Sequence, residues 1–238
     1  MALYVYAITA ENHPLDIDGL SGVGSEPASV RGISSGPLCA VVSDISEKIR
    51  PKRRDLSIHQ EVQEHLMRGG PVLPLQFGYT AADESTVEQV LQRDADGYLA
   101  NLDRVEGCAE FHVRASQDEG DLLRLILRET PEARELNERI RGGDRDPQLP
   151  LALGQLVAAQ VRERQDALAS ALVEALVPYA REHTVRQASG EDFLNFSLLV
   201  PDDRQEAFRT EAADLARQAG DGVEFRLNGP LPPYSFVE

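Results

Sequence analysis

Hydrophobic and polar residues alternate in several short segments of the first half of the chain. Residues 3–10 alternate and are rich in Val, Ile and Tyr, and residues 30–33 and 38–45 repeat the pattern on either side of Gly36 and Pro37. Alternation with a period of two predicts β-strands, and the Gly-Pro turn predicts that the second and third strands form an antiparallel hairpin. Residues 72–78 and 110–115 are two further predicted strands, and we expect the latter to close the sheet of a first domain.

Apolar residues at helical spacing lie between and after these strands. Residues 58–66 carry one stripe, preceded by Ser57 as the expected N-cap and Gln60 as its capping-box partner. A second helix is predicted from Asp83 to residue 102. After residue 118 the pattern is mainly helical, and residues 151–179 carry the longest stripe, with apolar positions three, four and seven apart. That spacing predicts a long amphipathic helix.

The order of these elements predicts an α+β protein with two related domains. Strands are predicted again at 184–187, 193–200 and 223–227, with one helix before the last of them. Both halves end in a helix, a glycine and a strand. We therefore expect two ferredoxin-like-related domains, each a sheet with helices on one face, at residues 1–116 and 117–238. The second has extra helices, including the long amphipathic one, and ends in a Pro-rich tail.

Charge and cysteine content limit the classes of partner. The chain has 24 basic and 40 acidic residues and a net charge of −16, which disfavours nucleic acid and anionic lipid surfaces. Its apolar runs are shorter than the ~20 residues of a membrane helix. The two cysteines, Cys39 and Cys108, form no CxxC motif and are typical of a reducing compartment. We expect a cytoplasmic protein that binds neither nucleic acid nor a lipid membrane.

The sequence contains no pattern that predicts catalysis or a cofactor. His59 and His65 are six residues apart, so their rings point about 120° apart on a helix, whereas zinc helices place histidines four apart. The glycines of residues 19–24 lack the Lys-Ser/Thr ending of a phosphate loop, and no GxSxG motif occurs. We therefore assign no catalytic, cofactor-binding or metal-binding residue.

Three features suggest protein binding instead. Pro74 cannot donate a ladder hydrogen bond, which indicates an edge strand or a bulge, and an open edge can accept a partner strand. A basic segment from Lys48 to Arg54 is either a solvated loop or a docking site for an acidic partner. Its candidate contacts are Lys52, Arg53 and Arg54. In the tail, Tyr234 and Phe236 either dock on this protein's own core, which we favour, or contact a partner.

Three segments of the chain resemble the GvpF/GvpL family of gas vesicle proteins. The first is His59-x-x-Val62 followed by Val-Leu-Pro-Leu-Gln-Phe-Gly at residues 72–78. The second leads from Leu102 through a glycine into the strand at residue 110. The third is Gly-Pro-Leu-Pro-Pro-Tyr-Ser-Phe at residues 229–236. Their order and spacing hold over nearly the whole chain, although Gln76 replaces a common basic residue and Leu231 a common Trp.

The resemblance implies an accessory or minor structural protein of gas vesicle assembly, located in the cytoplasm and at the gas vesicle, the flotation compartment of some prokaryotes. It implies binding to the hydrophobic shell protein GvpA and to other accessory proteins, with no cofactor and no catalytic activity. Phe77, in the first segment, joins the candidate contacts. The alternative is an enzyme or small-ligand-binding protein on a ferredoxin-like fold, which would need a pocket with convergent polar groups.

Overall fold

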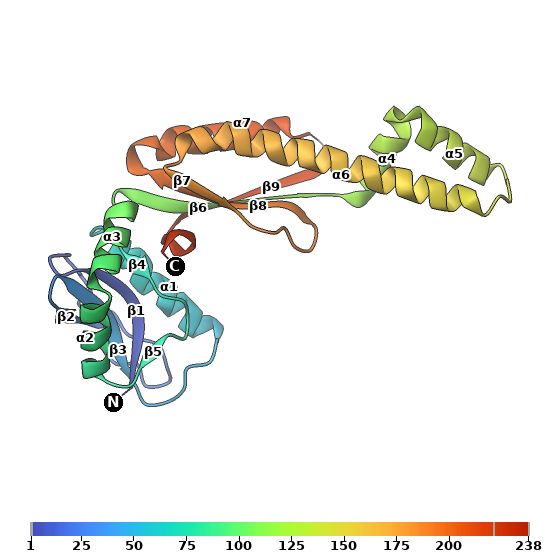
Figure 1. The fold of residues 1–238 in the computed structure, drawn as a ribbon. Coiled ribbons are helices and arrows are strands. Elements are labelled where there is room, and N and C mark those ends of the chain that lie inside the picture. The colour runs from blue at the N-terminus through green and yellow to red at the C-terminus, as the bar shows by residue number, and fades with distance from the viewer. Residues whose placement is uncertain (1, 221, 238) are drawn as a thin grey trace. The chain divides into compact units, whose positions relative to one another are not determined.

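A computed structural model describes residues 2–220 and 222–237, so residue 1 of the first expected domain and residues 221 and 238 of the second lie outside it. The chain forms two sheets with helices (Figure 1) and divides into two compact units. The described residues of the first unit are 2–111, 199–202 and 229–237. The second unit takes residues 112–198 and 203–228.

The first sheet is built from the N-terminal strands. Its strands are β1 (Ala2–Ala10), β2 (Arg31–Ser35), β3 (Leu38–Ile45), β4 (Leu73–Pro74) and β5 (Thr80–Ala81). Their order is β2-β3-β1-β4, and β5 also pairs with β1. The predicted hairpin is confirmed, because β2 and β3 are antiparallel with Ser35 opposite Leu38. Gly36 makes this turn with a φ of +60°, a backbone conformation that favours glycine.

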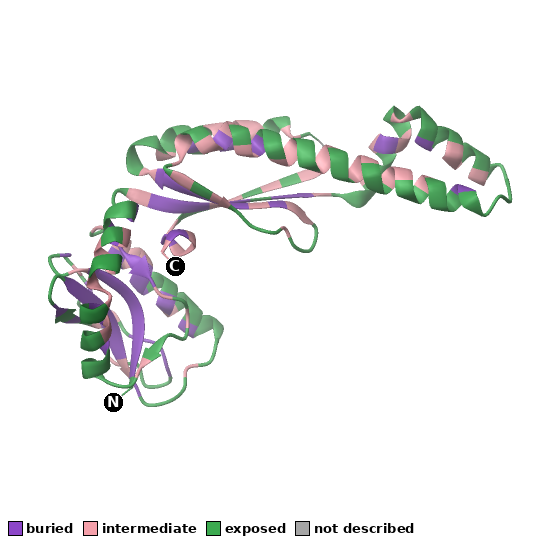
Figure 2. Ribbon diagram, viewed as in Figure 1, coloured by how far each residue is buried: buried purple, intermediate pink, exposed green. Residues whose placement is uncertain are grey.

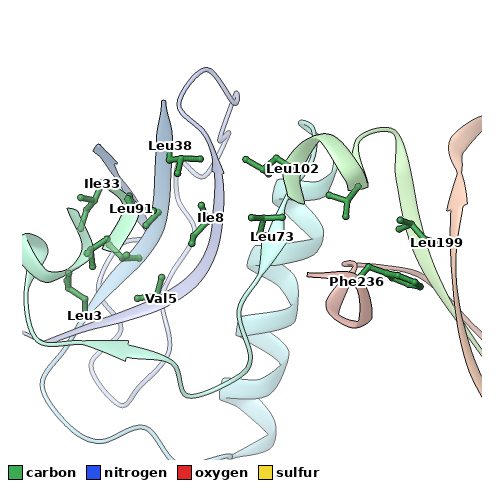
Figure 3. Close-up of a cluster of buried hydrophobic side chains, with 14 residues drawn as sticks. Leu3, Val5, Ile8, Ile33, Leu38, Leu73, Leu91, Leu102, Leu199 and Phe236 are labelled. Atoms are coloured by element: carbon green, nitrogen blue, oxygen red, sulfur yellow. The ribbon is translucent and has the colours of Figure 1, made fainter. Parts of the chain in front are cut away.

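Helices cover both faces of this sheet, which corrects the expectation of one covered face. Helix α1 (Arg53–Met67) packs on one face, and α2 (Glu84–Arg93) and α3 (Ala95–Val105) pack on the other. The register of β1 shifts between Val5 and Ala7, so Val5 and Ile8 face the same side, towards α2 and α3 (Figure 3). Tyr4 and Tyr6 face α1. Strand β1 is therefore buried on both sides (Figure 2), because both sets of alternating residues are large.

The second sheet has the ferredoxin-like connection. Its strands are β6 (Cys108–Gln117), β7 (Glu182–Val185), β8 (Asp192–Pro201) and β9 (Val223–Leu231), in the order β7-β8-β6-β9. Between β6 and β7 lie α4 (Glu119–Glu129), α5 (Pro131–Arg141) and α6 (Gln148–Leu176), and between β8 and β9 lies α7 (Gln205–Gln218). This is a β-α-β-β-α-β unit with two additional helices in its first crossover. The first sheet has the same strand order with a loop in place of the first helix, so the predicted fold class is confirmed.

Two sequence-based assignments at the domain boundary need correction. The strand predicted to close the first sheet is part of β6, which lies between β8 and β9 in the second sheet. The tail belongs to the first compact unit, and the unit boundaries fall within β6, β8 and β9. The compact units thus depart from the continuous ranges 1–116 and 117–238. Periodicity shows where a strand begins and ends, but the sheet that it joins depends on long-range pairing.

The long helix is confirmed as α6, which has 29 residues. Its first half packs against α4 and α5 through Leu153, Val157 and neighbouring apolar residues. Leu172 and Leu176 are buried in its second half, where α6 contacts α7. Short 3-10 turns follow at η1 (Val177–Tyr179), η2 (Asp202–Arg204) and η3 (Tyr234–Phe236). Within the described residues, no helix is long and apolar enough to span a membrane.

The boundaries of two predicted helices differ in the structure. Helix α1 begins at Arg53, so Ser57 lies inside it and its hydroxyl donates to the Arg53 carbonyl oxygen at 3.0 Å instead of capping the helix. The helix predicted from Asp83 to residue 102 is divided at Asp94 into α2 and α3. Asp83 does cap α2, since its Oδ1 accepts from the Thr86 amide at 2.8 Å.

Candidate protein-binding surfaces

Polar side chains on the buried face of α1 connect this helix to β1 and to the tail. The Nδ1 atom of His59 lies 3.0 Å from the Tyr4 hydroxyl, and its Nε2 atom lies 3.1 Å from the Tyr234 hydroxyl. The Tyr4 hydroxyl also accepts from the Gly78 amide at 3.0 Å. The Tyr234 hydroxyl donates to Gln63 Oε1. These directions assign the ring proton of His59 to Nε2, which donates to Tyr234 while Nδ1 accepts from Tyr4.

Burial keeps the titratable groups of this network neutral. It lowers the pKa of His59 to about 4 and raises the pKa of Tyr234 to about 12. The pKa of Tyr4 is also raised by burial. The amide of Gln63 donates to the carbonyl oxygens of Tyr6 at 2.7 Å and Leu75 at 3.0 Å. Each of these buried polar groups therefore has a partner, as a stable packed core requires.

The tail is docked on the first unit, the alternative that the sequence analysis favours. The Ser235 amide donates to Glu110 Oε2 at 2.8 Å, and the Ser235 hydroxyl donates to Glu110 Oε1. Phe236 is 3% exposed and packs in the cluster that contains Leu73 and Leu199 (Figure 3). The three segments that carry the family resemblance thus meet where the tail docks.

This packing buries two of the candidate contacts, Pro74 and Phe236, and partly covers two others, Phe77 and Tyr234. Pro74 lies in β4, at the end of the strand order, so its edge position is confirmed, but it is buried. Phe77 is half-buried, with its ring centroid 5.6 Å from that of His59. Tyr234 is half-buried and Phe236 is buried. These residues hold the docked tail and the loop after β4, because their apolar surface packs within this unit.

The edge of the first sheet continues beyond β4 into residues 78–80, which are exposed. Tyr79 is 51% exposed, and its carbonyl oxygen accepts from the Val5 amide at 3.0 Å. Next to it, β5 pairs with β1 through Thr80 opposite Tyr4 and Ala81 opposite Leu3. No other described strand pairs with β5. The sequence analysis missed Tyr79, although a large aromatic residue directly after the family-like segment was an available signal.

An apolar pocket opens beside Tyr79. Its volume is about 90 Å³, and it lies between the sheet and the helices α2 and α3. None of its lining residues carries a charge: Val5, Ile8, Ala40, Leu75, Tyr79, Thr80, Ala81, Thr86, Val87, Val90, Leu91 and Tyr98. A pocket of this composition can receive an apolar side chain, and it brings together no acid, base or nucleophile.

The basic residues predicted as a loop lie at the start of α1. Lys52 is the N-cap, and Arg53 and Arg54 form the first turn; all three are exposed. Of these three, Lys52 lines a hollow of about 390 Å³, together with Lys48 and Arg50. Cations at a helix N-terminus oppose the helix dipole and destabilise the helix by roughly 0.3–1 kcal/mol each. Their position is therefore not explained by the stability of α1.

The two histidines of α1 point to different partners. His59 is bound by two tyrosine hydroxyls, whereas His65 Nε2 lies 3.5 Å from Asp16 Oδ2. In the part of the chain that the structure describes, no group of three or more His, Cys, Asp or Glu side chains could hold a metal ion. His59 thus takes part in hydrogen bonding within the core.

Comparisons with known proteins agree with the family resemblance. The family model described as gas vesicle synthesis protein GvpL/GvpF matches residues 2–238. The chain is 41% identical to gas vesicle protein F of Streptomyces sp. (strain CB03234), over 100% of both chains. It is 28% identical to gas vesicle protein L of the same strain, over 98% of this chain and 92% of that protein.

Solved structures show the same fold. The crystal structure of gas vesicle protein GvpF from Anabaena sp. PCC7120 matches with a TM-score of 0.86 at 21% identity, covering 100% of this chain and 98% of that one. GvpF from Microcystis aeruginosa matches with a TM-score of 0.81 at 24% identity, covering 100% and 99%. With the family model spanning nearly every residue, the chain belongs to the gas vesicle synthesis protein GvpL/GvpF family.

Proposed function

We propose that this protein is an accessory protein of gas vesicle assembly that binds the hydrophobic shell protein GvpA through the exposed edge at residues 76–81 and the apolar pocket beside it. The observation that supports this most directly is Tyr79, which is 51% exposed at an uncharged pocket and next to β5, a strand that pairs with β1 on one side and with no described strand on the other. An open edge can pair with an incoming strand, and the pocket can take one of its side chains.

Apolar contact supplies most of the binding free energy in this proposal. Burial of apolar surface stabilises a complex by about 25 cal/mol per Å², and salt does not screen it. Exposed ion pairs contribute about 0–1 kcal/mol each and weaken as salt is added. The net charge of −16 keeps a complex with a hydrophobic subunit dispersed in solution. The protein acts in the cytoplasm and at the vesicle, without cofactor or catalysis.

The basic surface at Lys52, Arg53 and Arg54 is proposed as a second contact, for acidic accessory proteins. Its cations are exposed at the start of α1. The alternative of an enzyme or small-ligand-binding protein requires convergent polar groups in a pocket, and the lining of the apolar pocket beside Tyr79 offers none that is charged.

Co-purification with GvpA from cells that make both proteins tests the proposal. We expect binding to survive 1 M salt, and the variant Tyr79→Ser to reduce the recovered GvpA. Leu151→Ser is the matched control, because Leu151 is 58% exposed and lies in the other unit. If the complex dissociates in salt, or is lost when Lys52, Arg53 and Arg54 are all changed to Gln, the edge is not the GvpA site and the basic surface is.

A further inference from the structure

The second unit contains a groove that neither the fold nor the proposed function explains. It has a volume of about 920 Å³ and lies where the end of β6 and the starts of β8 and β9 meet α4 and α6. This is at the upper end of the size range of binding pockets. Its helical wall is apolar and consists of Leu122 and Leu123 of α4 with Val157 and Val161 of α6, and Phe193 and Val223 of the sheet add further apolar lining. Leu123 is 41% exposed, so part of this wall is in contact with water.

The charged residues of the lining are all acidic. Five carboxylates line the groove, namely Asp118, Glu119, Glu191, Asp192 and Glu224, and no Lys, Arg or His side chain lines it. Three of these carboxylates have partners within the unit. Asp118 caps α4 by accepting from the Asp121 amide at 2.8 Å, and Asp192 binds Arg226.

The third is Glu224, whose ion pair with Arg226 is longer, and the remaining two carboxylates are available to a partner. Glu224 Oε1 lies 3.8 Å from Arg226 Nε, too far for a hydrogen bond. Among the described residues, neither Glu119 nor Glu191 forms an ion pair. Like charges around one groove repel one another, and this repulsion is relieved when cations bind among them. The groove therefore favours a positively charged occupant and disfavours phosphate, nucleic acid and acidic peptides.

We propose that this groove binds a cationic amphipathic α-helix of a partner protein. Val157 and Val161 lie one turn apart on α6, beside Leu122 and Leu123 of α4, so the apolar wall presents the surface of two packed helices. A third helix can lay its apolar stripe against such a surface, as α5 does elsewhere on α4 and α6. Lysines or arginines beside that stripe then meet Glu119, Glu191 and Glu224 at the rim.

A designed peptide tests the groove directly. The probe is a fluorescent 14-residue peptide with leucines along one helical face and lysines on the other, and its binding is followed by anisotropy in 0.1 M salt. The groove variant changes Glu119, Glu191 and Glu224 to Gln, and we expect it to weaken binding about tenfold. The matched control changes Glu132, Glu135 and Glu138 of α5, which are exposed, to Gln. It therefore alters the net charge by the same amount as the groove variant. We expect a change of less than about twofold there.

A second pair of variants tests whether the apolar wall contributes to binding of the peptide. Leu123→Asn should also weaken binding of the peptide, whereas Leu151→Asn, at an exposed leucine of α6 that does not line the groove, should not. Both leucines are well exposed, and circular dichroism confirms that each variant remains folded. The helical signal of the peptide should increase when it binds.

Three results would overturn the proposal. Equal weakening by both triple variants would show general attraction to an acidic protein. Equal binding of a peptide with glutamate in place of lysine would show that charge does not select the occupant. If the protein alone self-associates in sedimentation and the groove variant abolishes this, the occupant is a second copy of the chain. These experiments contain no GvpA, so their failure leaves the proposed edge contact standing.

Discussion

His59 and Tyr234 are separated by 175 positions in the chain, yet the His59 Nε2 atom lies 3.1 Å from the Tyr234 hydroxyl. This contact joins the middle of α1 to the docked tail. The same hydroxyl donates to Gln63 Oε1, and the Gln63 amide donates in turn to Leu75 and Tyr6. One tyrosine hydroxyl thus completes a network that connects the tail, α1, β1 and the segment after β4.

Tyr234→Phe should destabilise the first unit by about 1–3 kcal/mol. The substitution leaves the Nε2 proton of His59 and the Oε1 atom of Gln63 without their partner, and a buried unpaired polar group costs about that much. Unfolding in urea measures the change. Tyr79→Phe is the control, because Tyr79 is 51% exposed, and it should change stability by less than about 0.5 kcal/mol. Equal effects of the two substitutions would show that the hydroxyl network contributes nothing.

Stability should fall as the pH drops below about 6.5. The pKa of His59 is about 4 in the folded protein because burial disfavours the charged ring, whereas its ordinary value is 6.5. The unfolded chain therefore binds more protons between pH 6.5 and 4, and the free energy of unfolding decreases through this window by about 3 kcal/mol. Burial also lowers the pKa of His13, which adds to the effect.

Two variants identify the source of this pH dependence. His59→Gln should flatten the fall between pH 6.5 and 4, because glutamine does not titrate. His183→Gln, at an exposed position on β7, should leave the fall unchanged. An unchanged slope in His59→Gln would assign the pH dependence to other groups.

Gly229→Ala should destabilise the protein by more than about 1 kcal/mol. Gly229 has a φ of +145°, and a Cβ atom there would lie 2.5 Å from Phe111 Cδ1 and 2.9 Å from the Glu110 carbonyl oxygen. Gly154→Ala in α6 is the opposite case, since no atom lies within 4 Å of the added Cβ. That substitution should stabilise the helix by about 0.5–1 kcal/mol. Thermal unfolding of both variants measures the difference, and a neutral Gly229→Ala would contradict the close contact.

Limited proteolysis should cut first between α5 and α6. Residues 142–147 are all exposed there, and Arg141 and Arg145 are trypsin sites. The long loop at residues 11–28 is a weaker substrate than its composition suggests, because Ile17 and Val23 are buried and the Val23 amide donates to the Tyr6 hydroxyl at 2.9 Å. Proteinase K, which has no need of a basic residue, distinguishes the two segments. Early cutting at residues 11–28 would show that these anchors are weak.

Local patterns in the sequence were sufficient to predict most elements. The period of two placed β1, β3 and β8 within a residue or two, and the helical stripe placed α6, because these periodicities are produced by burial of one face of each element. The edge position of Pro74 also followed from local chemistry, since a residue without an N–H cannot join two neighbours in a ladder. The family resemblance followed from the order and spacing of three short segments.

Long-range packing decided the remaining features. Periodicity could not show that β6 joins the second sheet, that helices cover both faces of the first, or that α1 begins at Arg53, before its apolar stripe. It also could not show that the tail docks beside His59, which leaves Tyr79 rather than Phe236 exposed. The sequence by itself determined which residues form each strand and helix, because those preferences are local. Only the tertiary structure decided which surfaces stay open to a partner, because exposure depends on every segment that packs nearby.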